Sequence, residues 1–181
     1  GSRRRANKKI LRHNFEIRSF SDFNDIYLIK KIYNLNQANV PEVGSIKTLN
    51  DFINLLKLSD QIFLSYIDKK IAGFAVCFYE NSNYSSLNYK YFSKNYEKFL
   101  YIDRIAVKKN YRRKGVGSAL YNHLIKQYEK TKKIICCEVN IEPMNIISLE
   151  FHSRFNFKEI NEKDFISHKV RYLARTAEDT L

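Results

Sequence analysis

The sequence predicts a single domain of mixed α/β class, in which helices cover both faces of a central sheet. The chain has 181 residues, a length that suits one compact domain with a full core. Strand-like and helix-like apolar periods follow one another in the order β-α-α-β-β-β-α-β-α-β-β, which favours a sheet with helices on both faces. Hydrophobic residues make up 44% of the chain, which excludes general disorder.

The first half of the chain has the periodicities of a strand, two helices and a hairpin. Residues 15–20 alternate as a strand does, and Ser21-Asp22 then provides a cap for a helix. A short second helix is expected to begin at Thr48. Residues 62–67 and 71–78 are two apolar runs separated by a short polar turn, which predicts a β-hairpin.

The second half begins with a polar, tyrosine-rich segment, residues 79–98, for which the sequence predicts a long loop. Loops of that length are usually functional or disordered. A strand over 100–107 follows, and Gly115 opens the next helix. The remaining elements are a strand, a helix and two strands, at 134–141, 145–154, about 157–160 and about 168–173.

The charge of the chain is strongly positive, because 32 Lys and Arg stand against 19 Asp and Glu, a net charge of +13. Gly1-Ser2 resembles the remnant of an expression tag. We predict a basic N-terminal arm over 1–13, one domain over 14–173 and a polar, frayed tail over 174–181. The charge favours a solvated basic surface over an anionic partner such as RNA, the ribosome or a phosphorylated cofactor, and both readings stay open.

Several classes of protein are excluded by what the sequence lacks. No stretch approaches the ~18 uninterrupted apolar residues of a membrane span, and we expect no secretory leader. The three cysteines, Cys77, Cys136 and Cys137, have no CxxC spacing. We therefore expect no disulfide framework, no metal site, no membrane partner and a cytoplasmic location, for a monomer or homodimer.

The most informative segment runs from Val107 to Leu120, where a strand leads through a glycine-bearing turn directly into a helix. Gly115 and Gly117 let backbone N–H groups approach a ligand, and the start of a helix presents unpaired donors. The turn also carries three basic side chains, Arg112, Arg113 and Lys114. It is predicted to bind phosphate. It is neither a Walker A loop nor a Rossmann fingerprint, because no GxxxxGK[ST] string exists and Leu120 stands where the third small residue belongs.

The pattern Arg112-x-x-Gly115-x-Gly117 resembles the Q/R-x-x-G-x-G/A signature of the GNAT superfamily of N-acetyltransferases. A second segment, Asn145-x-x-Ser148-x-x-Phe151-His152-x-x-Phe155-Asn156-Phe157, is similar to the second motif of that family, N-x-x-A-x-x-Φ-Y-x-x-x-G-F with Φ apolar. The resemblance covers about residues 14–173 and looks like that of a poorly characterised subgroup. It implies a mixed, mostly antiparallel sheet that is splayed between its fourth and fifth strands.

The resemblance also implies an activity, the transfer of an acetyl group from acetyl-CoA to the primary amine of a small molecule, a protein or a peptide. Acetyl-CoA would be a co-substrate, attacked directly in a ternary complex without a metal. Turn amides would hold its pyrophosphate, the preceding strand would pair with the pantetheine, and Asn145 would bond to that arm. The implied cofactor residues are Ile105, Ala106, Val107, Arg112, Arg113, Lys114, Gly115, Val116, Gly117, Ser118, Asn145, Ser148 and Phe151.

The acceptor amine must be neutral to attack a thioester. The pKa of a lysine amine, ~10.4, lies about 3.4 units above pH 7, whereas the pKa of a peptide α-amine, ~7.7–8.0, lies only about one unit above it. A lysine or polyamine acceptor therefore needs more desolvation and a stronger base.

Two carboxylates are candidates for that base. Asp103 stands where spermidine/spermine acetyltransferases carry a strand glutamate, and alternation places it on the face of Ile105 and Val107. It either acts as base or cation-binding group, or forms an ion pair with a nearby Arg or Lys. Glu138, on the neighbouring strand, either acts in catalysis or is a buried, paired acid.

His152 is the chief departure from the family pattern, because a tyrosine that protonates the leaving thiolate usually stands there. It shares a helix face with Asn145 and Ser148, and an imidazole can donate a proton to a thiolate. The alternative is a histidine bonded to solvent or backbone. Asn156, in place of the family's glycine, is tolerable because asparagine enters the left-handed region.

The tyrosines around residues 79–98 either pack on the surface or form an aromatic wall of the acceptor site, which suits a cationic amine. Tyr89, Tyr101 and Asp103 are the candidate acceptor-binding residues. A different class of function stays open as well: a non-catalytic acyl-CoA-binding or RNA-associated module with the same fold.

Overall fold

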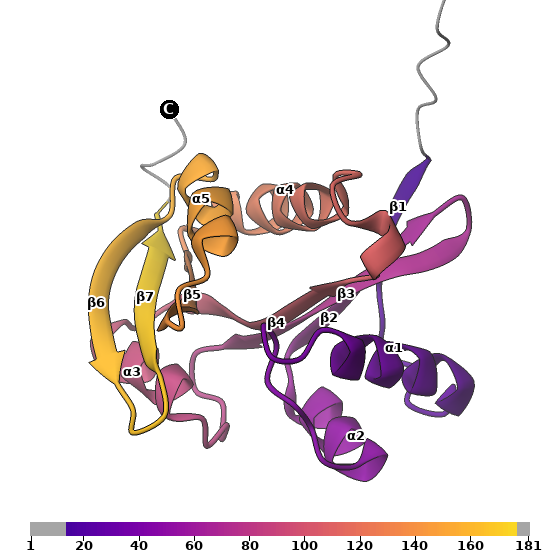
Figure 1. The fold of residues 1–181 in the computed structure, drawn as a ribbon, viewed down its shortest axis with the longest axis horizontal. Helices are drawn as coiled ribbons and strands as arrows, with labels where there is room; N and C mark the ends of the chain where they lie inside the picture. Colours follow the sequence, from indigo (N-terminus) through magenta and orange to yellow (C-terminus); the bar gives the residue numbers. More distant parts are fainter. Residues whose placement is uncertain (1–13, 177–181) are drawn as a thin grey trace, which may run out of the picture.

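A single mixed sheet of seven strands runs through the protein, and the computed structural model describes residues 14–176 (Figure 1). The elements in chain order are β1 (Phe15–Ser19), α1 (Ile26–Ala38), α2 (Leu49–Leu58), β2 (Gln61–Ile67), β3 (Lys70–Tyr79), α3 (Leu87–Asn95), β4 (Phe99–Val107), η1 (Lys109–Tyr111), α4 (Val116–Tyr128), η2 (Glu129–Thr131), β5 (Ile134–Glu142), α5 (Ile146–Arg154), β6 (Lys158–Asp164) and β7 (Lys169–Arg175). The strand order is β1-β2-β3-β4-β5-β7-β6, and every neighbouring pair except β4–β5 is antiparallel. The predicted fold class is confirmed.

The parallel pair β4–β5 opens into a splay. Phe99–Tyr101 pairs with Ile134–Cys136, and the pairing between these strands goes no further. Beyond that point β4 stays with β3 while β5 turns away with β7 (Figure 1). The β5-facing edge of residues 102–107 therefore has no strand partner among the described residues. The splay predicted from the resemblance is confirmed.

Helices cover both faces of the sheet, as predicted. Figure 1 shows α1, α2 and α3 on one face and α4 and α5 on the other. Side chains of β3 contribute to both cores: Phe74, Val76 and Phe78 lie in the core under α1, α2 and α3, whereas Ala72 and Cys77 lie in the core under α4.

The first helix begins later than the sequence predicts. Asp25 caps α1 by accepting the Leu28 N–H at 3.0 Å, whereas Asp22 accepts the Asn24 N–H at 3.1 Å in a preceding turn. Both aspartates offer the same capping chemistry, and local sequence does not rank them. The cap predicted for the second helix is confirmed, since Thr48 accepts the Asp51 N–H at 3.0 Å.

The long loop predicted over 79–98 is wrong in its centre, where α3 forms. Ser86 caps this helix, and its two buried side chains are Tyr89 and Phe92. The tyrosines made the segment look polar, but a tyrosine buries its ring whenever its hydroxyl finds a partner. The Tyr89 hydroxyl has one, because it donates to the Tyr79 carbonyl at 2.6 Å.

The last strand, β7, runs two residues past its predicted end at Leu173. Ala174 and Arg175 are buried in it, so they belong to the sheet rather than to the tail expected to start at 174. The basic arm predicted over 1–13 and positions 177–181 of the tail lie outside the described residues.

Three further observations concern the described residues alone. None of their helices has the length and apolar character to cross a bilayer. Within residues 14–176, no group of three or more His, Cys, Asp or Glu side chains gathers as metal ligands would. Cys77, Cys136 and Cys137 are buried free thiols.

Candidate active site

The turn between β4 and α4 has two residues in the left-handed region, Arg113 at φ 64° and Gly115 at φ 85°. Gly115 is the N-cap residue of α4 and supplies no capping side chain. The amides of Val116, Gly117 and Ser118 begin the helix and cannot find acceptors within it. These donors and the helix dipole have the geometry that an anion-binding site requires.

The start of α4 lies close to α5. A Cβ built on Gly117 would approach ring atoms of Phe151 at 3.6 and 3.7 Å, which is ordinary contact distance. The Phe151 ring also meets Tyr121 edge-on, with ring centroids 4.9 Å apart. The structure therefore brings together residues of the two sequence motifs, which lie far apart in the chain.

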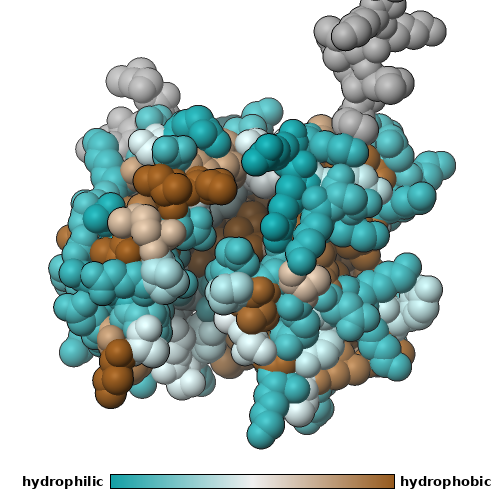
Figure 2. All heavy atoms as spheres, in the orientation of Figure 1, coloured by the Kyte–Doolittle hydropathy of each residue, from teal (hydrophilic) through white to brown (hydrophobic). Residues whose placement is uncertain are grey.

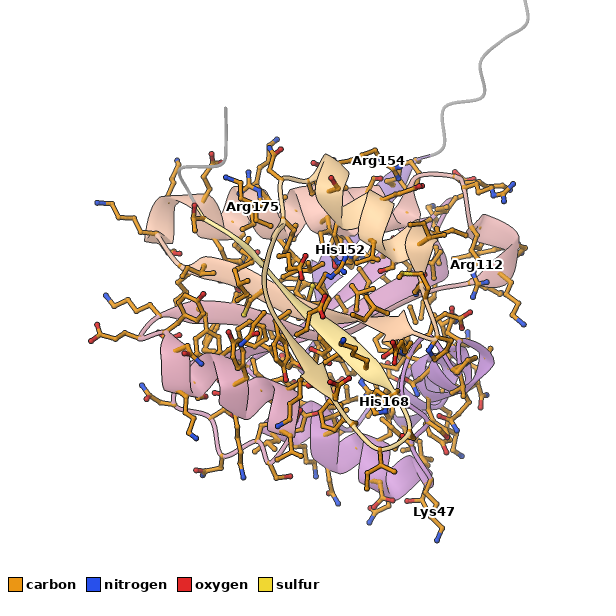
Figure 3. All side chains as sticks on the ribbon, turned by 60° about the vertical axis from the view of Figure 1, so that its left-hand side comes forward. Lys47, Arg112, His152, Arg154, His168 and Arg175 are labelled. Atoms are coloured by element: carbon orange, nitrogen blue, oxygen red, sulfur yellow. The ribbon has the colours of Figure 1, made fainter. Side chains whose placement is uncertain are left out.

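The basic side chains of the turn differ in their surroundings. Arg112 donates from Nη2 to Oδ1 of Asn39 at 2.7 Å, and so ties the turn to the C-terminal end of α1. Figure 3 shows Arg112 at the edge of the molecule. Arg113 and Lys114 are exposed, and Lys114 Nζ lies 5.4 Å from the centre of the Tyr111 ring. The exposed pair supplies the positive charge that an anionic ligand would meet.

The residues of β4 that are predicted to hold the cofactor face both sides of the sheet. Ile105 and Val107 pack against the core under α4, but Ala106 points into the opposite core. The Asn145 side-chain oxygen already caps α5 by accepting the Ser148 N–H at 3.1 Å, which leaves its amide hydrogens for a ligand. An uncapped helix start, an open strand edge and exposed cations fit a nucleotide thioester such as acetyl-CoA.

Glu138 lies on the other side of the splay, facing α3. Both of its carboxylate oxygens accept from the Tyr101 hydroxyl, at 2.7 and 2.9 Å, and Asn88 Nδ2 donates to Oε1 at 3.2 Å. Burial raises the pKa of Glu138 to about 8, assisted by the charge of Asp103 and opposed by the Tyr101 and Asn88 hydrogen bonds. A carboxyl with such a pKa can take a proton near neutral pH.

A β-bulge in β4 breaks the alternation expected around Asp103. The residues on either side of Asp103 pair with consecutive residues of β3, Ile102 with Cys77 and Arg104 with Val76. Asp103 is therefore an extra residue without a pairing partner. The expectation that Asp103 shares a face with Ile105 and Val107 is wrong. Those two contact the core under α4, whereas the Asp103 carboxylate meets Tyr84, which stacks on Phe78 in the opposite core.

Each oxygen of the Asp103 carboxylate accepts a hydrogen bond. Tyr84 donates to Oδ1 at 2.7 Å, and Arg104 Nε donates to Oδ2 at 2.8 Å. The Arg104 and Asp103 side chains are only 11% and 5% exposed. Of the two readings open from the sequence, the ion pair is the one that this geometry supports.

Replacing Arg104 with methionine is expected to lower the free energy of unfolding by about 3–5 kcal/mol, because the buried Asp103 charge loses its counterion. Arg104 also donates to the Asn36 side chain at 2.9 Å and the Gly44 carbonyl at 3.0 Å. Urea unfolding measures the change. Arg18→Met is the matched control, because its ion pair with Glu16 is exposed and contributes little. Equal losses in the two variants would contradict the assignment.

His152 points into the protein rather than into the splay. It is 5% exposed and lies between α5 and the sheet (Figure 3). The Ser148 carbonyl lies 2.7 Å from Nδ1 and can only accept, so Nδ1 carries the proton. Nε2 then accepts from the Tyr121 hydroxyl at 2.5 Å. Burial lowers the pKa of His152, which favours this neutral form.

The two predicted acceptor-binding tyrosines are both core residues. Tyr101 is fully buried and reaches the site through its hydroxyl on Glu138. Tyr89 is 1% exposed, and its hydroxyl lies on the Tyr79 carbonyl and the Ser82 N–H. Asn88 and Tyr172 lie beside Glu138, and the sequence does not single them out because their partners are far away in the chain.

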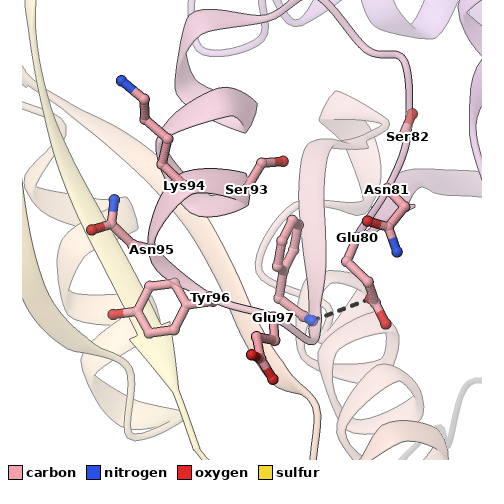
Figure 4. Close-up of a pocket in the computed structure, with 9 residues that line it drawn as sticks. Glu80, Asn81, Ser82, Ser93, Lys94, Asn95, Tyr96 and Glu97 are labelled. Atoms are coloured by element: carbon pink, nitrogen blue, oxygen red, sulfur yellow. Dashed lines mark hydrogen bonds between the residues drawn. The ribbon is translucent and has the colours of Figure 1, made fainter.

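A cavity of about 580 Å³ lies away from the splay, between the end of β3, the end of α3 and the start of β4 (Figure 4). Its lining residues are Glu80, Asn81, Ser82, Ser93, Lys94, Asn95, Tyr96, Glu97 and Phe99. Glu80 accepts the Phe99 N–H at 3.3 Å and pairs with Lys133 Nζ at 3.0 Å. None of the predicted site residues lines it.

Figure 2 shows a separate central hollow with hydrophobic side chains at its bottom and a mainly hydrophilic rim.

The sequence matches the model of the acetyltransferase (GNAT) family over residues 29–157. No curated protein matches it. Among solved structures it is similar to the ribosomal-protein-S18-alanine N-acetyltransferase of Escherichia coli, with a TM-score of 0.65 and 18% identity over 91% of this chain and 94% of that one.

Two plant structures are similar to the same extent. Naa50 of Arabidopsis thaliana, in complex with the bisubstrate analogue CoA-Ac-MVNAL, has a TM-score of 0.66 and 17% identity, covering 90% of this chain and 98% of that one. NAA60 of Arabidopsis thaliana, in complex with acetyl-CoA, has a TM-score of 0.67 and 14% identity, with the same coverage of 90% and 98%. At these identities the similarities show a shared fold.

Proposed function

Because the chain belongs to the GNAT acetyltransferase family, we propose that it transfers the acetyl group of acetyl-CoA to a primary amine, which attacks directly in a ternary complex. One observation carries the proposal: an uncapped helix start and a proton-accepting carboxyl lie on opposite sides of one splay between two strands. Acetyl-CoA supplies the thioester whose acetyl group is transferred.

The residues on the α4 side of the splay would bind that co-substrate. The amides of Val116, Gly117 and Ser118 would donate to the diphosphate, with Arg113 and Lys114 adding charge. The open edge of β4 offers main-chain groups to the pantetheine, Asn145 offers its amide hydrogens, and Phe151 packs beside the turn. These contacts need backbone geometry more than particular side chains.

Glu138 would take the proton of the acceptor amine. Its pKa of about 8 lies within the range of a peptide α-amine, ~7.7–8.0, so that proton transfer is nearly balanced. The pKa of a lysine amine, ~10.4, lies about 2.4 units above that of Glu138, so transfer of its proton to Glu138 would cost roughly 3 kcal/mol. Asp103 adds no free carboxylate for a second cation, because Arg104 and Tyr84 occupy it. We therefore propose the N-terminal α-amine of a peptide as the preferred acceptor.

The similar structures support this acceptor class. The Escherichia coli protein is an N-acetyltransferase of an alanine on ribosomal protein S18, and Naa50 was solved with an analogue that joins CoA to a peptide. His152 has no part in the proposed transfer, since both its ring nitrogens have partners inside the protein. A thiol with a pKa near 8.5 leaves readily without a dedicated donor.

A matched pair of peptides tests the proposal. One carries a free α-amine and no lysine, and the other has the same sequence with a blocked N-terminus and one lysine. We expect CoA thiol release and acetylated product with the first, at a kcat/KM at least about tenfold above that of the second. A preference for the lysine peptide would contradict the acceptor class. Tight acetyl-CoA binding with no release for any amine would instead favour a non-catalytic acyl-CoA-binding module.

A further inference from the structure

We propose that Asn88 of α3 and Tyr172 of β7 form a reversible hydrogen-bond pair that positions the Glu138 carboxyl and stays satisfied whether that carboxyl is ionised or protonated. The inference rests on the proposed function, in which Glu138 gains and loses a proton in each turnover. Asn88 and Tyr172 are positioning residues, because they act through Glu138.

The contacts form a chain across three elements. The Tyr172 hydroxyl donates to Asn88 Oδ1 at 2.8 Å, and Asn88 Nδ2 donates to Glu138 Oε1 at 3.2 Å. Tyr101 donates to the same carboxylate from β4. Every group that meets the carboxylate in this arrangement is a donor, which is the pattern that an ionised carboxylate requires.

The backbone that carries Asn88 is held firmly against the sheet. Tyr89 and Phe92 bury α3 in the core, at 1% and 0% exposure. Tyr91 stacks on the Tyr172 ring, with centroids 4.1 Å apart and planes within 6°. The distance between the Asn88 amide and the Tyr172 hydroxyl is therefore set by packing, and the amide is left to turn about its own axis.

That rotation answers the problem of a protonated Glu138. Once Glu138 carries a proton, its O–H needs an acceptor in a place with little water. A half-turn of the Asn88 amide presents Oδ1 to the Glu138 O–H and Nδ2 to the Tyr172 oxygen, because a hydroxyl both donates and accepts. The Glu138 carboxyl and the Asn88 amide then have hydrogen-bond partners in both protonation states, and a carboxyl left without one would cost free energy.

Other titratable groups also face Glu138 and influence its titration. Asp103 raises its proton affinity, and the hydrogen bond of Tyr101 lowers it. The remaining groups are all neutral near pH 7 and come from α4, β5, β7 and the segment before α3: Tyr84, Tyr121, Cys136, Cys137 and Tyr172. The Arg104 charge is engaged by Asp103. Unlike these titratable groups, Asn88 has an amide, which offers both a donor and an acceptor at fixed positions.

Asn88→Leu tests the proposal, with Asn95→Leu as the matched control. Asn95 is an asparagine on the same helix whose amide bonds only to the Tyr91 carbonyl, at 2.7 Å. The carboxylic-acid C=O band of Glu138, identified by its loss in Glu138→Gln, is titrated by infrared spectroscopy without substrates. In Asn88→Leu the midpoint should rise by about one pH unit, because the ionised form loses a charge-assisted hydrogen bond whereas the protonated form loses only a weaker, neutral one. In Asn95→Leu it should stay that of the unaltered protein.

Kinetics give a second readout that a merely structural role would not move. With an acceptor whose own amine titrates below the measured range, the rising limb of kcat in Asn88→Leu should shift upward by the same unit, and the KM for acetyl-CoA should stay the same. Asn88→Met replaces the leucine variant if the latter does not fold. An unshifted infrared midpoint in a folded variant overturns the inference.

The two arms separate this inference from the proposed function. A shifted infrared midpoint in a protein that acetylates no amine would retain the hydrogen-bond pair and reject the proposed function. Turnover by the unaltered protein together with an unshifted midpoint in Asn88→Leu would support the proposed function and reject the hydrogen-bond pair.

Discussion

Glu138→Gln is expected to lower kcat for a peptide α-amine by about 10²–10⁴, the range that a positioned general base contributes. Glutamine keeps the shape of the side chain and can still accept from Tyr101, so the fold and the acetyl-CoA affinity should be retained. Thiol release under saturating substrates measures the loss. Glu142→Gln, an exposed residue at the end of the same strand, is the control and should keep full activity.

The same role for Glu138 predicts how the acetylation rate depends on pH. A base must be ionised to act, and burial raises the pKa of Glu138 to about 8, so the rate should rise with pH and level off above that value. Glu138→Gln should lose this rising limb when the acceptor amine titrates well below it. A variant that keeps kcat within about threefold, or keeps the limb, would show that Glu138 is not the base.

Gly117→Glu is expected to weaken acetyl-CoA binding by at least about 100-fold, because a carboxylate would stand where the turn amides are to meet a diphosphate. The loss should not come from unfolding, since an acidic side chain in the first turn of α4 favours the helix dipole. A Cβ at this position also meets only ordinary contacts with Phe151. Isothermal titration with CoA measures the effect.

Gly117→Ala is the matched control for this site. It adds the same Cβ without the charge, so it should bind CoA much more tightly than Gly117→Glu. Equal losses in the two variants would mean that the added bulk, not the charge, blocks the ligand. Unchanged affinity in Gly117→Glu would place the ligand elsewhere.

The sequence predicts best what depends on local pattern. The turn from Val107 into α4 is a run of adjacent residues, and glycine, positive charge and a helix start can all be read in order. The helix face shared by Ser148 and His152 is likewise local, and the Ser148 carbonyl does bond to His152. The splay follows from the resemblance and not from periodicity, since strands that separate have the same pattern as strands that pair.

What the sequence does not predict depends on contacts between distant residues. A single bulge at Asp103 places its side chain on the sheet face opposite to the one that alternation predicts, and no residue type in β4 indicates this bulge. The helix α3 is not evident in the sequence because its tyrosines make the segment look polar. In the structure, the Tyr89 ring is buried in the core and its hydroxyl has a partner within the fold. Tyr172 and Asn88 are 84 positions apart in the chain, so their hydrogen bond becomes visible only once the sheet and α3 are assembled.

The proposed activity depends on the amides at the start of α4, which we propose hold the diphosphate of a thioester co-substrate. A crystal structure of the protein with bound CoA tests it most directly. We expect diphosphate oxygens within hydrogen-bonding distance of the N–H groups of Val116, Gly117 and Ser118, with the thiol end reaching the splay between β4 and β5. CoA bound at another place, with this turn empty, would contradict it.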